Sequence, residues 1–369
     1  MSEPNTHSPD PSGVVLITGF PGFIARRLLT RLATHPPEGQ GAPRFVLLAL
    51  SSMVAAAEAT LRDLAADHPD LAERCRVVVG DITEPDLGLA PAVYAQLIGE
   101  VTRVWHLAAL YNLAVEESLA YRVNVLGTRH VLDFCDACAH FERLLYISTC
   151  YVSGFREGVI REVELDEGQS FKNHYESTKF WAEVAVRRRA DAIPTVIFRP
   201  SIVVGDSITG ATDKYDGPYT IIRFLERLPE GVPVPNLGSG RAPVNLAPID
   251  YVVAAMQTIA DQDDAVGLTF QLADPNPMPV HDVLELILTT LGKPPAVGAM
   301  PPWVADLALR IRPLRRGLQI PREALTYFNH DAHYDCSNTL RALEGTGVRC
   351  PHLSSYMDTL VDFMRRHPG

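Results

Sequence analysis

The segment 173–183, NHYESTKFWAE, places a tyrosine and a lysine four residues apart in a helical pattern. At this spacing Tyr175 and Lys179 share one face of a helix, one turn apart. A free tyrosine titrates near pH ~10, and a neighbouring ammonium group favours the phenolate and lowers that pKa. The pair therefore predicts a general acid that gives a proton to a carbonyl oxygen.

Lysine is rare in this chain, which contains four lysines and 29 arginines. Arginine serves about as well on a solvated helix face, so a lysine kept among so many arginines indicates a need for a compact ammonium group. An exposed lysine on a surface helix is the alternative interpretation of Lys179.

Two further polar residues fit the same chemistry. Thr149 ends the apolar run RLLYIST, where its hydroxyl is placed to donate a second hydrogen bond to the reacting oxygen. Asn124, in YRVNVLGTRHV, is placed to anchor a helix or a water next to the lysine.

The elements that must position these residues form an alternating pattern. Continuous runs rich in Val, Ile and Leu occur at 13–18, 44–50, 76–80, 101–107, 143–149 and 195–200, and a seventh is expected at 267–273. Amphipathic stretches lie between them, at 22–34, 53–67, 116–139 and 175–191. Continuous apolar runs are typical of strands buried on both faces. The sequence therefore predicts an α/β fold, a doubly wound parallel Rossmann sheet of about seven strands.

Two regions interrupt this pattern, and they suggest a second lobe. Residues 205–248 are rich in Gly and Pro, and residues 278–369 are mostly helical in pattern. We expect these two segments to form a smaller, mostly helical C-terminal substrate-capping lobe. Residues 13–204 and 249–277 would form the NAD(P)-binding Rossmann domain, and residues 1–12 a disordered polar tail without the features of a signal peptide.

The first strand leads into a glycine-rich turn, TGFPGFIA, with Gly19, Gly22 and Ala25 at the key positions. Glycines permit a tight turn and a close approach of the backbone to a pyrophosphate, which then meets the N-terminus of the following helix. With a strand before and a helix after it, the turn predicts dinucleotide binding. An ordinary strand-helix turn is the alternative.

The end of the second strand bears on the choice of cofactor. An acidic residue there would hold a ribose 2′-hydroxyl, and an arginine would accept a 2′-phosphate. The sequence LLALSSMV offers Leu50, Ser51 and Ser52 instead. Because Ser51 or Ser52 can donate to a phosphate and Arg26 can approach it, NADP(H) is slightly favoured over NAD(H). Asp81, after the third strand, either touches the adenine or forms a turn.

Composition excludes several classes of function. The net charge of -11 argues against nucleic acid as a partner. Six cysteines show no disulfide framework, which favours a cytoplasmic protein with reduced thiols. Cys135 and Cys138 form a C-x-x-C inside an apolar helical pattern and are interpreted as buried thiols, so no metal site is expected. No run of eighteen apolar residues is present, so no transmembrane helix is expected.

An ordered set of motifs over about 13–275 resembles the extended short-chain dehydrogenase/reductases. The matching segments are TGFPGFIA, GDI, HLAA, NVLGT, ISTCYVSG, YESTK and FRPSIVVG. The resemblance implies Thr149, Tyr175 and Lys179 as the catalytic trio with Asn124 beside it, and Lys179 as the residue that bonds the nicotinamide ribose. It implies His106 as structural or adjacent to the cofactor. The implied cofactor-binding residues are Gly19, Phe20, Gly22, Phe23, Ile24, Ser51, Ser52, Asp81, Ile82, Ala108, Lys179, Pro200, Ile202 and Val203.

A narrower set of segments is similar to the fatty-acyl and thioester reductase branch. These are STCYVSG, RPSIVVGDSITGATDKYDGPY and the tail YFNHDAHYDCSNTLRAL. That branch reduces acyl thioesters to aldehydes and commonly carries an arginine for NADPH where this chain has Leu50. The implied substrate is a lipophilic small molecule that is free, bound to CoA or bound to a separate carrier protein.

Several functions are therefore open. The first is reduction of an acyl thioester to an aldehyde, with Tyr175 as general acid. The second is reduction of a ketone or quinone-like secondary metabolite by the same trio. A sugar-nucleotide epimerase or dehydratase and a non-catalytic NAD(P) sensor are weaker alternatives, because the acidic residue that holds NAD is missing and the trio is complete.

Three further segments bear on substrate and partners. The KYDGPY segment (214–219) either lines the pocket or forms a turn between lobes. The basic amphipathic stretch 301–316 either packs on the core or allows peripheral contact with an acidic membrane. The superfamily often dimerises through helices equivalent to 116–139 and 175–191, so a homodimer is possible.

Overall fold

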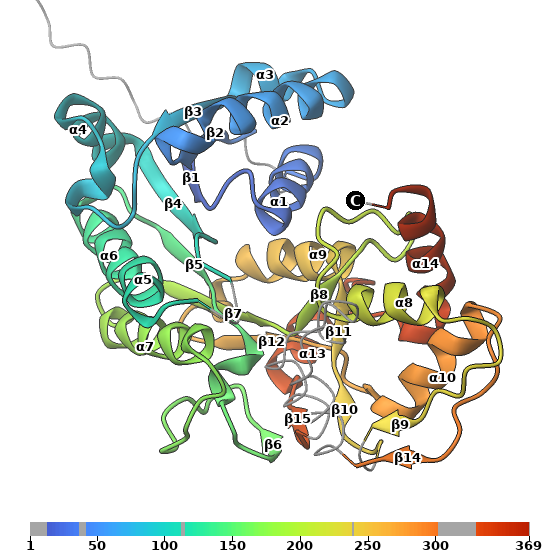
Figure 1. Cartoon of the computed structure of the whole chain (residues 1–369). Coiled ribbons are helices and arrows are strands. Elements are labelled where there is room, and N and C mark those ends of the chain that lie inside the picture. The colour runs from blue at the N-terminus through green and yellow to red at the C-terminus, as the bar shows by residue number, and fades with distance from the viewer. Residues whose placement is uncertain (1–12, 37–41, 112–114, 238–239, 302–329, 369) are drawn as a thin grey trace, which may run out of the picture.

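The computed structural model describes residues 13–36, 42–111, 115–237, 240–301 and 330–368. Seven strands form one parallel sheet in the order β12-β7-β5-β4-β1-β2-β3 (Figure 1). They are β1 (Val14–Thr18), β2 (Arg44–Ala49), β3 (Cys75–Val79), β4 (Val101–His106), β5 (Arg143–Ile147), β7 (Thr195–Pro200) and β12 (Thr269–Leu272). The predicted doubly wound parallel sheet is confirmed.

Helices cover both faces of this sheet and form two apolar layers. Successive residues of a strand point to opposite faces, so Ile17 of β1 packs in one layer and Leu16 in the other. The first layer contains residues of α1 (Phe23–Thr34), α2 (Val54–Asp67), α3 (Asp70–Arg74) and α9 (Ile249–Ala260). The second contains residues of α4 (Pro91–Glu100), α6 (Gly127–Ala137) and α7 (His174–Arg189). Burial on both faces explains why the strands have continuous apolar sequences.

The helix expected at 116–139 is divided into three parts. It begins as α5 (Glu117–Ala120), continues as a π-helical segment, η3 (Tyr121–Leu126), and ends as α6. Short π-helical segments inside helices occur frequently at functional sites, and η3 carries Asn124.

A separate apolar cluster lies beside the sheet (Figure 1). It joins α8 (Pro218–Arg227), α10 (Val280–Thr290) and α14 (Met357–Arg366). Short paired strands accompany these helices: β8 (Ile202–Val204) with β11 (Leu246–Pro248), β9 (Asn236–Leu237) with β14 (Ala299–Met300), and β10 (Pro243–Val244) with β13 (Met278–Pro279). Two segments that are distant in sequence thus share one core. The domain boundaries given above stay a prediction.

The segment after 330 returns to the sheet. β15 (Ala332–Tyr334) pairs with β6 (Gly158–Ile160), and α13 (Ser337–Leu343) packs against α9 and β12. The remaining short helical turns are η1 (Ser51–Met53), η2 (Pro85–Gly88), η4 (Cys150–Ser153), η5 (Asp263–Ala265) and η7 (Leu353–Ser355).

Candidate active site

The loop between β1 and α1 is too tight for larger residues. Gly19 has a φ of +84°, and a Cβ there would lie 2.7 Å from the backbone nitrogen of Ala108. A Cβ at Gly22 would lie 2.7 Å from the carbonyl oxygen of Gly19. Among the described residues, no side chain caps the N-terminus of α1, and its first turn holds no carboxylate. The loop therefore offers N–H groups and a positive dipole end that fit a dinucleotide pyrophosphate.

Three neighbouring residues fix the loop on the core. Phe20 and Phe23 are buried in the layer under α1, and Ile24 packs against it. Their side chains point away from the solvent side of the loop, so a cofactor would meet their backbone. The resemblance assigns Phe20, Phe23 and Ile24 to cofactor binding, and the structure places all three beside the glycine turn.

The end of β2 is open to solvent. Leu50, Ser51 and Ser52 are exposed at the entry of η1, and none of them is acidic. Arg26, which the sequence suggested for a 2′-phosphate, forms an ion pair with Asp213. This pair ties α1 to the Gly-rich segment that follows β8.

Asp81 and Ile82 form the turn after β3. The Asp81 carboxylate accepts a hydrogen bond of 2.8 Å from the Thr83 backbone N–H, and the Asp81 N–H donates to the Leu87 carbonyl oxygen at 2.7 Å. Ile82 is buried beside Leu87. The turn-forming role of Asp81 is thus visible in its contacts.

Thr149 and Tyr175 come together at the carboxyl end of β5. Thr149 is the N-cap of η4, and Tyr175 lies in the first turn of α7. The elements that carry them, η4 and α7, pack against each other. Burial raises the pKa of Tyr175, and the neighbouring Thr149 hydroxyl acts in the opposite direction. Two hydroxyl donors therefore converge on the same edge of the sheet as the glycine loop.

Lys179 lies one turn further along α7 and is buried. Its Nζ donates to the Tyr146 hydroxyl oxygen at 2.9 Å and to the Ile147 carbonyl oxygen at 2.7 Å. Burial lowers the pKa of the Lys179 ammonium to about 7, against an opposing effect of the Glu183 charge. The expectation that Lys179 lowers the pKa of Tyr175 is wrong for this structure, because burial dominates at the tyrosine and the lysine amino group is directed to β5.

Asn124 fastens η3 to two neighbours. Its Nδ2 donates to the Thr178 hydroxyl at 2.9 Å, and its Oδ1 accepts from the Leu110 backbone N–H at 2.8 Å. Thr178 immediately precedes Lys179, so Asn124 holds the helix that carries the lysine.

The segment RPSIVVG follows β7 and borders the same edge. The carbonyl oxygen of Pro200 lies 3.5 Å from the Thr149 hydroxyl, which donates to it. Ile202 and Val203 are half-buried in β8. The structure thus brings Pro200 next to Thr149.

An aromatic residue that the sequence analysis missed packs on Tyr175. The rings of Tyr111 and Tyr175 meet edge to face with centroids 5.0 Å apart. Lys214, the first residue of the KYDGPY segment, places its Nζ 5.2 Å from the centroid of the Tyr111 ring. The only signal for Tyr111 was its place directly after the HLAA motif.

A buried ion pair also escaped the sequence analysis. The Glu183 carboxylate of α7 accepts from Arg199 of β7 at 2.6 Å and from the Ser148 hydroxyl at 2.6 Å. The arginine within the apolar run TVIFRP was the available signal, since a buried charge requires a partner.

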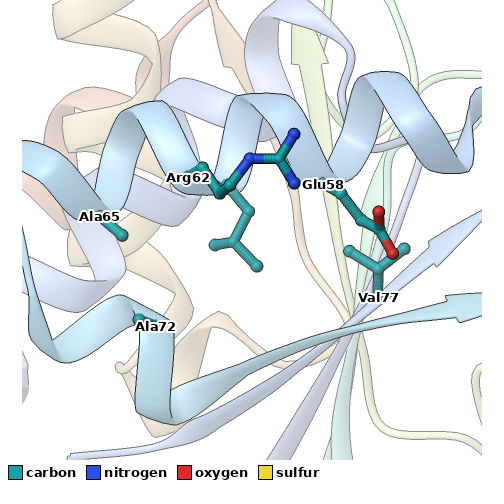
Figure 2. A pocket seen from close by; sticks show the side chains of 6 residues that line it. Glu58, Arg62, Ala65, Ala72 and Val77 are labelled. Atoms are coloured by element: carbon teal, nitrogen blue, oxygen red, sulfur yellow. The ribbon is translucent and has the colours of Figure 1, made fainter.

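One surface hollow lies elsewhere, between α2, α3 and the edge strand β3 (Figure 2). It is lined by Glu58, Leu61, Arg62, Ala65, Ala72 and Val77. None of the predicted site residues lines it.

Other sequence-based expectations concern regions away from the trio. Cys135 and Cys138 lie in the apolar layer between α6 and the sheet. Within the described ranges, no cluster of three His, Cys, Asp or Glu side chains could hold a metal ion, and no helix is long and apolar enough to cross a membrane. The stretch 301–316 lies, apart from Pro301, outside the described residues.

Known proteins share this sequence and fold. FrzA, a non-canonical nonribosomal peptide synthetase of Cladobotryum sp, is 26% identical over 96% of this chain and 36% of its own length. Fatty acyl-CoA reductase 1 of Gallus gallus is 24% identical over 65% of this chain and 52% of its own length. The terminal R domain from the myxalamid PKS-NRPS biosynthetic pathway superposes with a TM-score of 0.80 at 25% identity, covering 96% of this chain and 91% of that one.

The chain spans between 6% and 36% of the length of the first three curated relatives it matches. A family model described as "Male sterility protein" matches residues 17–256, which include the glycine loop, Thr149, Tyr175 and Lys179. The chain therefore belongs to the male sterility protein family, within the NAD(P)-dependent oxidoreductases of the extended short-chain dehydrogenase/reductase type.

Proposed function

We propose that this chain reduces an acyl thioester, carried by CoA or by a carrier protein, to an aldehyde. The observation that carries the proposal is the placement of two hydroxyls, Thr149 at the start of η4 and Tyr175 in the first turn of α7, on the edge of the sheet that also holds the glycine loop. The likeness to a fatty acyl-CoA reductase and to the R domain of a PKS-NRPS pathway supports a thioester as the substrate. When bound, the reduced nicotinamide cofactor supplies the hydride.

The two hydroxyls act on the carbonyl oxygen of the thioester. As this oxygen gains negative charge, Thr149 and Tyr175 donate hydrogen bonds to it, which stabilises the transition state. Tyr175 then gives up its proton. Tyr175 carries its proton at neutral pH, and because burial raises its pKa, it gives the proton up only to an oxygen that has gained negative charge. Lys179, one turn away, would hold the nicotinamide ribose of the bound cofactor.

The products balance as one aldehyde and one thiol. The carbonyl carbon receives the hydride, the oxygen receives the proton of Tyr175, and a hemithioacetal results. Its C–S bond then breaks, the hydroxyl proton leaves, and the thiolate takes up a proton. One dinucleotide is oxidised for each thiol released, whereas a ketone reductase would release none.

We also propose NADPH as the preferred cofactor. The absence of a carboxylate at Leu50, Ser51 and Ser52 removes the group that would hold a ribose 2′-hydroxyl. Arg26 lies on α1, and its side chain is 29% exposed. The apolar cluster of α8, α10 and α14 would cap the lipophilic part of the substrate.

The test uses the purified full chain with NADPH or NADH and a long-chain acyl-CoA. We expect NADPH oxidation that is lost by at least about a hundredfold in Tyr175→Phe. Tyr94→Phe is the control, because this tyrosine lies on α4, which carries none of the predicted site residues, and packs against the second apolar layer. Undiminished activity in Tyr175→Phe would overturn the assignment.

A further inference from the structure

We propose that Lys172 is a positioning residue: its buried ammonium group holds the turn that carries Thr149 against the helix that carries Tyr175. The inference rests on the proposed function for its effect on turnover, but its geometry stands on contacts between η4 and the start of α7. The chain contains only four lysines, and Lys172 lies two residues before the first residue of α7.

The chain after η4 lies directly against the chain that leads into α7. We call this contact between residues 154–155 and 170–172 the clasp. The Phe155 backbone N–H donates to the Ser170 carbonyl oxygen at 2.9 Å. Gly154 has a φ of +59°, and a Cβ added there would lie 2.1 Å from the same oxygen. The two segments therefore meet backbone to backbone, with no room for a side chain between them.

Lys172 closes the clasp from the side of α7. Its Nζ donates to the Gly154 carbonyl oxygen and lies 5.1 Å from the centroid of the Phe155 ring. Gly154 is the C-cap of η4, and Thr149 is the N-cap of the same four-residue turn. The lysine thus holds the far end of the short turn that begins with the Thr149 hydroxyl.

The same lysine is fixed to the first turn of α7. Its Nζ lies 3.8 Å from Glu176 Oε1, and its backbone N–H donates to Glu176 Oε2 at 2.9 Å. The Glu176 backbone N–H donates in turn to the side chain of Asn173, the N-cap of α7, at 3.0 Å. Glu176 directly follows Tyr175, so these bonds set the turn from which Tyr175 projects.

Both charged side chains of this ion pair are withdrawn from water. The side chain of Lys172 is 1% exposed and that of Glu176 is 0% exposed. Water competes little for bonds at such a site, and a buried charge that loses its partner is costly. A lysine ammonium is compact and donates in three directions, whereas an arginine guanidinium is planar and larger. The site therefore explains a second lysine in a chain that otherwise uses arginine.

The other titratable groups near Lys172 come from two further segments. Glu157, shortly after η4, and Glu176 both act on its ammonium group. His330 donates to or accepts at the Arg156 backbone, with its Nε2 2.7 Å from that carbonyl oxygen. Burial lowers the pKa of His330 to about 4, and the charge of Lys172 acts in the same direction, so this ring is neutral at pH 7. Lys172 thus supplies the positive charge that the Glu176 carboxylate faces.

The first test is Lys172→Met in the full chain. We expect kcat with NADPH and acyl-CoA to fall by about tenfold or more, because Thr149 and Tyr175 shift relative to each other. The Kd for NADPH, measured by fluorescence titration, should be unchanged, because the glycine loop belongs to β1 and α1. Amide hydrogen exchange of a peptide covering residues 150–156 should become faster, because the clasp opens more often.

A double variant separates positioning from stability. Lys172→Met combined with Glu176→Gln removes both buried charges, so it should recover part of the stability that Lys172→Met loses. Its kcat should nevertheless stay low and the exchange of residues 150–156 fast, because the Gly154 carbonyl oxygen still lacks the lysine donor.

Arg143→Met is the matched control for loss of a buried cation. Arg143 also donates to backbone carbonyl oxygens, those of Ala260 and Gln262, but it lies at the opposite end of β5 from Thr149. This variant should be destabilised, while its kcat and its exchange at residues 150–156 should match those of the unmodified chain.

Unchanged kcat in Lys172→Met, or a kcat that returns together with stability in the double variant, overturns the inference. If Lys172→Met does not fold, the double variant decides: low kcat with fast exchange supports the inference, and kcat equal to that of the unmodified chain overturns it. If the unmodified chain oxidises no NADPH with the thioester, the proposed function fails instead. The exchange of residues 150–156 then still tests the clasp, and an unchanged rate in Lys172→Met overturns it.

Discussion

The side-chain amide of Asn124 donates a hydrogen bond of 2.9 Å to the hydroxyl of Thr178, the residue that precedes Lys179. The π-helical segment η3 is therefore joined to α7 at the turn that carries Tyr175 and Lys179. The same amide accepts from the Leu110 backbone N–H. One side chain thus joins α7 to the loop that brings Tyr111 against Tyr175.

Asn124→Ala should lower both stability and turnover. It leaves the buried Leu110 N–H and the Thr178 hydroxyl without this partner, which costs about 1–3 kcal/mol in the free energy of unfolding. A small displacement of α7 should reduce kcat by about tenfold or more. Urea unfolding and steady-state kinetics measure the two effects. Thr178→Val is the matched variant, since it removes the bond between η3 and α7 but keeps the bond of Asn124 to Leu110; it also removes the bond that the Thr178 hydroxyl donates to the His174 carbonyl oxygen. Equal kcat in all three proteins would contradict this role.

Gly19→Ala should abolish tight dinucleotide binding. The residue has a φ of +84°, and the added Cβ would lie 2.7 Å from the Ala108 nitrogen, so the loop must move. Cofactor titration by fluorescence should show a loss of at least about tenfold in affinity. Gly99→Ala is the control: no atom lies within 4 Å of its added Cβ on α4, and the exchange should stabilise the helix by up to about 1 kcal/mol.

Lys179→Met should stabilise the fold while it removes activity. The folded pKa of Lys179 is about 7, below its ordinary value of 10.5. Between these values the unfolded chain binds a proton that the folded chain does not, so the contribution of Lys179 to stability rises with pH. The advantage of the methionine variant should be largest at pH 7 and below, and should vanish near pH 10.5. Denaturant titrations at several pH values measure it, and an advantage that grows with pH would be inconsistent with a buried ammonium group.

Glu183→Ala should be strongly destabilising. The carboxylate is fully buried against Arg199, and its removal leaves a buried guanidinium without its anionic partner. Loss of one partner of such a pair costs about 3–5 kcal/mol. Adding Arg199→Met to Glu183→Ala should recover part of this loss, as a double-mutant cycle would show. Strict additivity of the two changes would mean that the pair is not coupled.

Arg26→Ala should weaken the binding of NADPH more than the binding of NADH. If Arg26 exchanges Asp213 for the 2′-phosphate of the cofactor, its loss should raise the KM for NADPH by about tenfold and change that for NADH little. Asp213→Ala should lower the KM for NADPH, because it leaves the Arg26 guanidinium without a competing partner. If Arg26→Ala changed the KM for NADPH and for NADH equally, the ion pair between Arg26 and Asp213 would serve only to hold the loop.

The parallel sheet could be predicted from sequence because strands buried on both faces have continuous apolar runs. The positions of Tyr175 and Lys179 followed from helical spacing. The contact between Tyr146 and Lys179 could not, because in the run RLLYIST the tyrosine ring looks like any core residue. Its hydroxyl accepts from Lys179, which folding brings from elsewhere in the chain. The π-helical turn at η3 was likewise invisible, since one extra residue in a helical turn leaves the amphipathic pattern almost unchanged.

The pKa of Tyr175 shows how a correct pairing can still give a wrong electrostatic prediction. Spacing places the lysine one turn away, but it does not reveal that the amino group is directed to Tyr146 and Ile147. It also does not reveal how deeply the tyrosine is packed against Tyr111. Burial is a property of the assembled site, and it decides the direction of the shift here.

The central claim is tested most directly by the ratio of free thiol released to NADPH oxidised, measured in one reaction with a long-chain acyl-CoA. Reduction of a thioester to an aldehyde predicts a ratio of one, with both signals lost together in Tyr175→Phe. NADPH oxidation without thiol release, obtained only with ketone or quinone substrates, would contradict it and assign the trio to reduction of a different carbonyl.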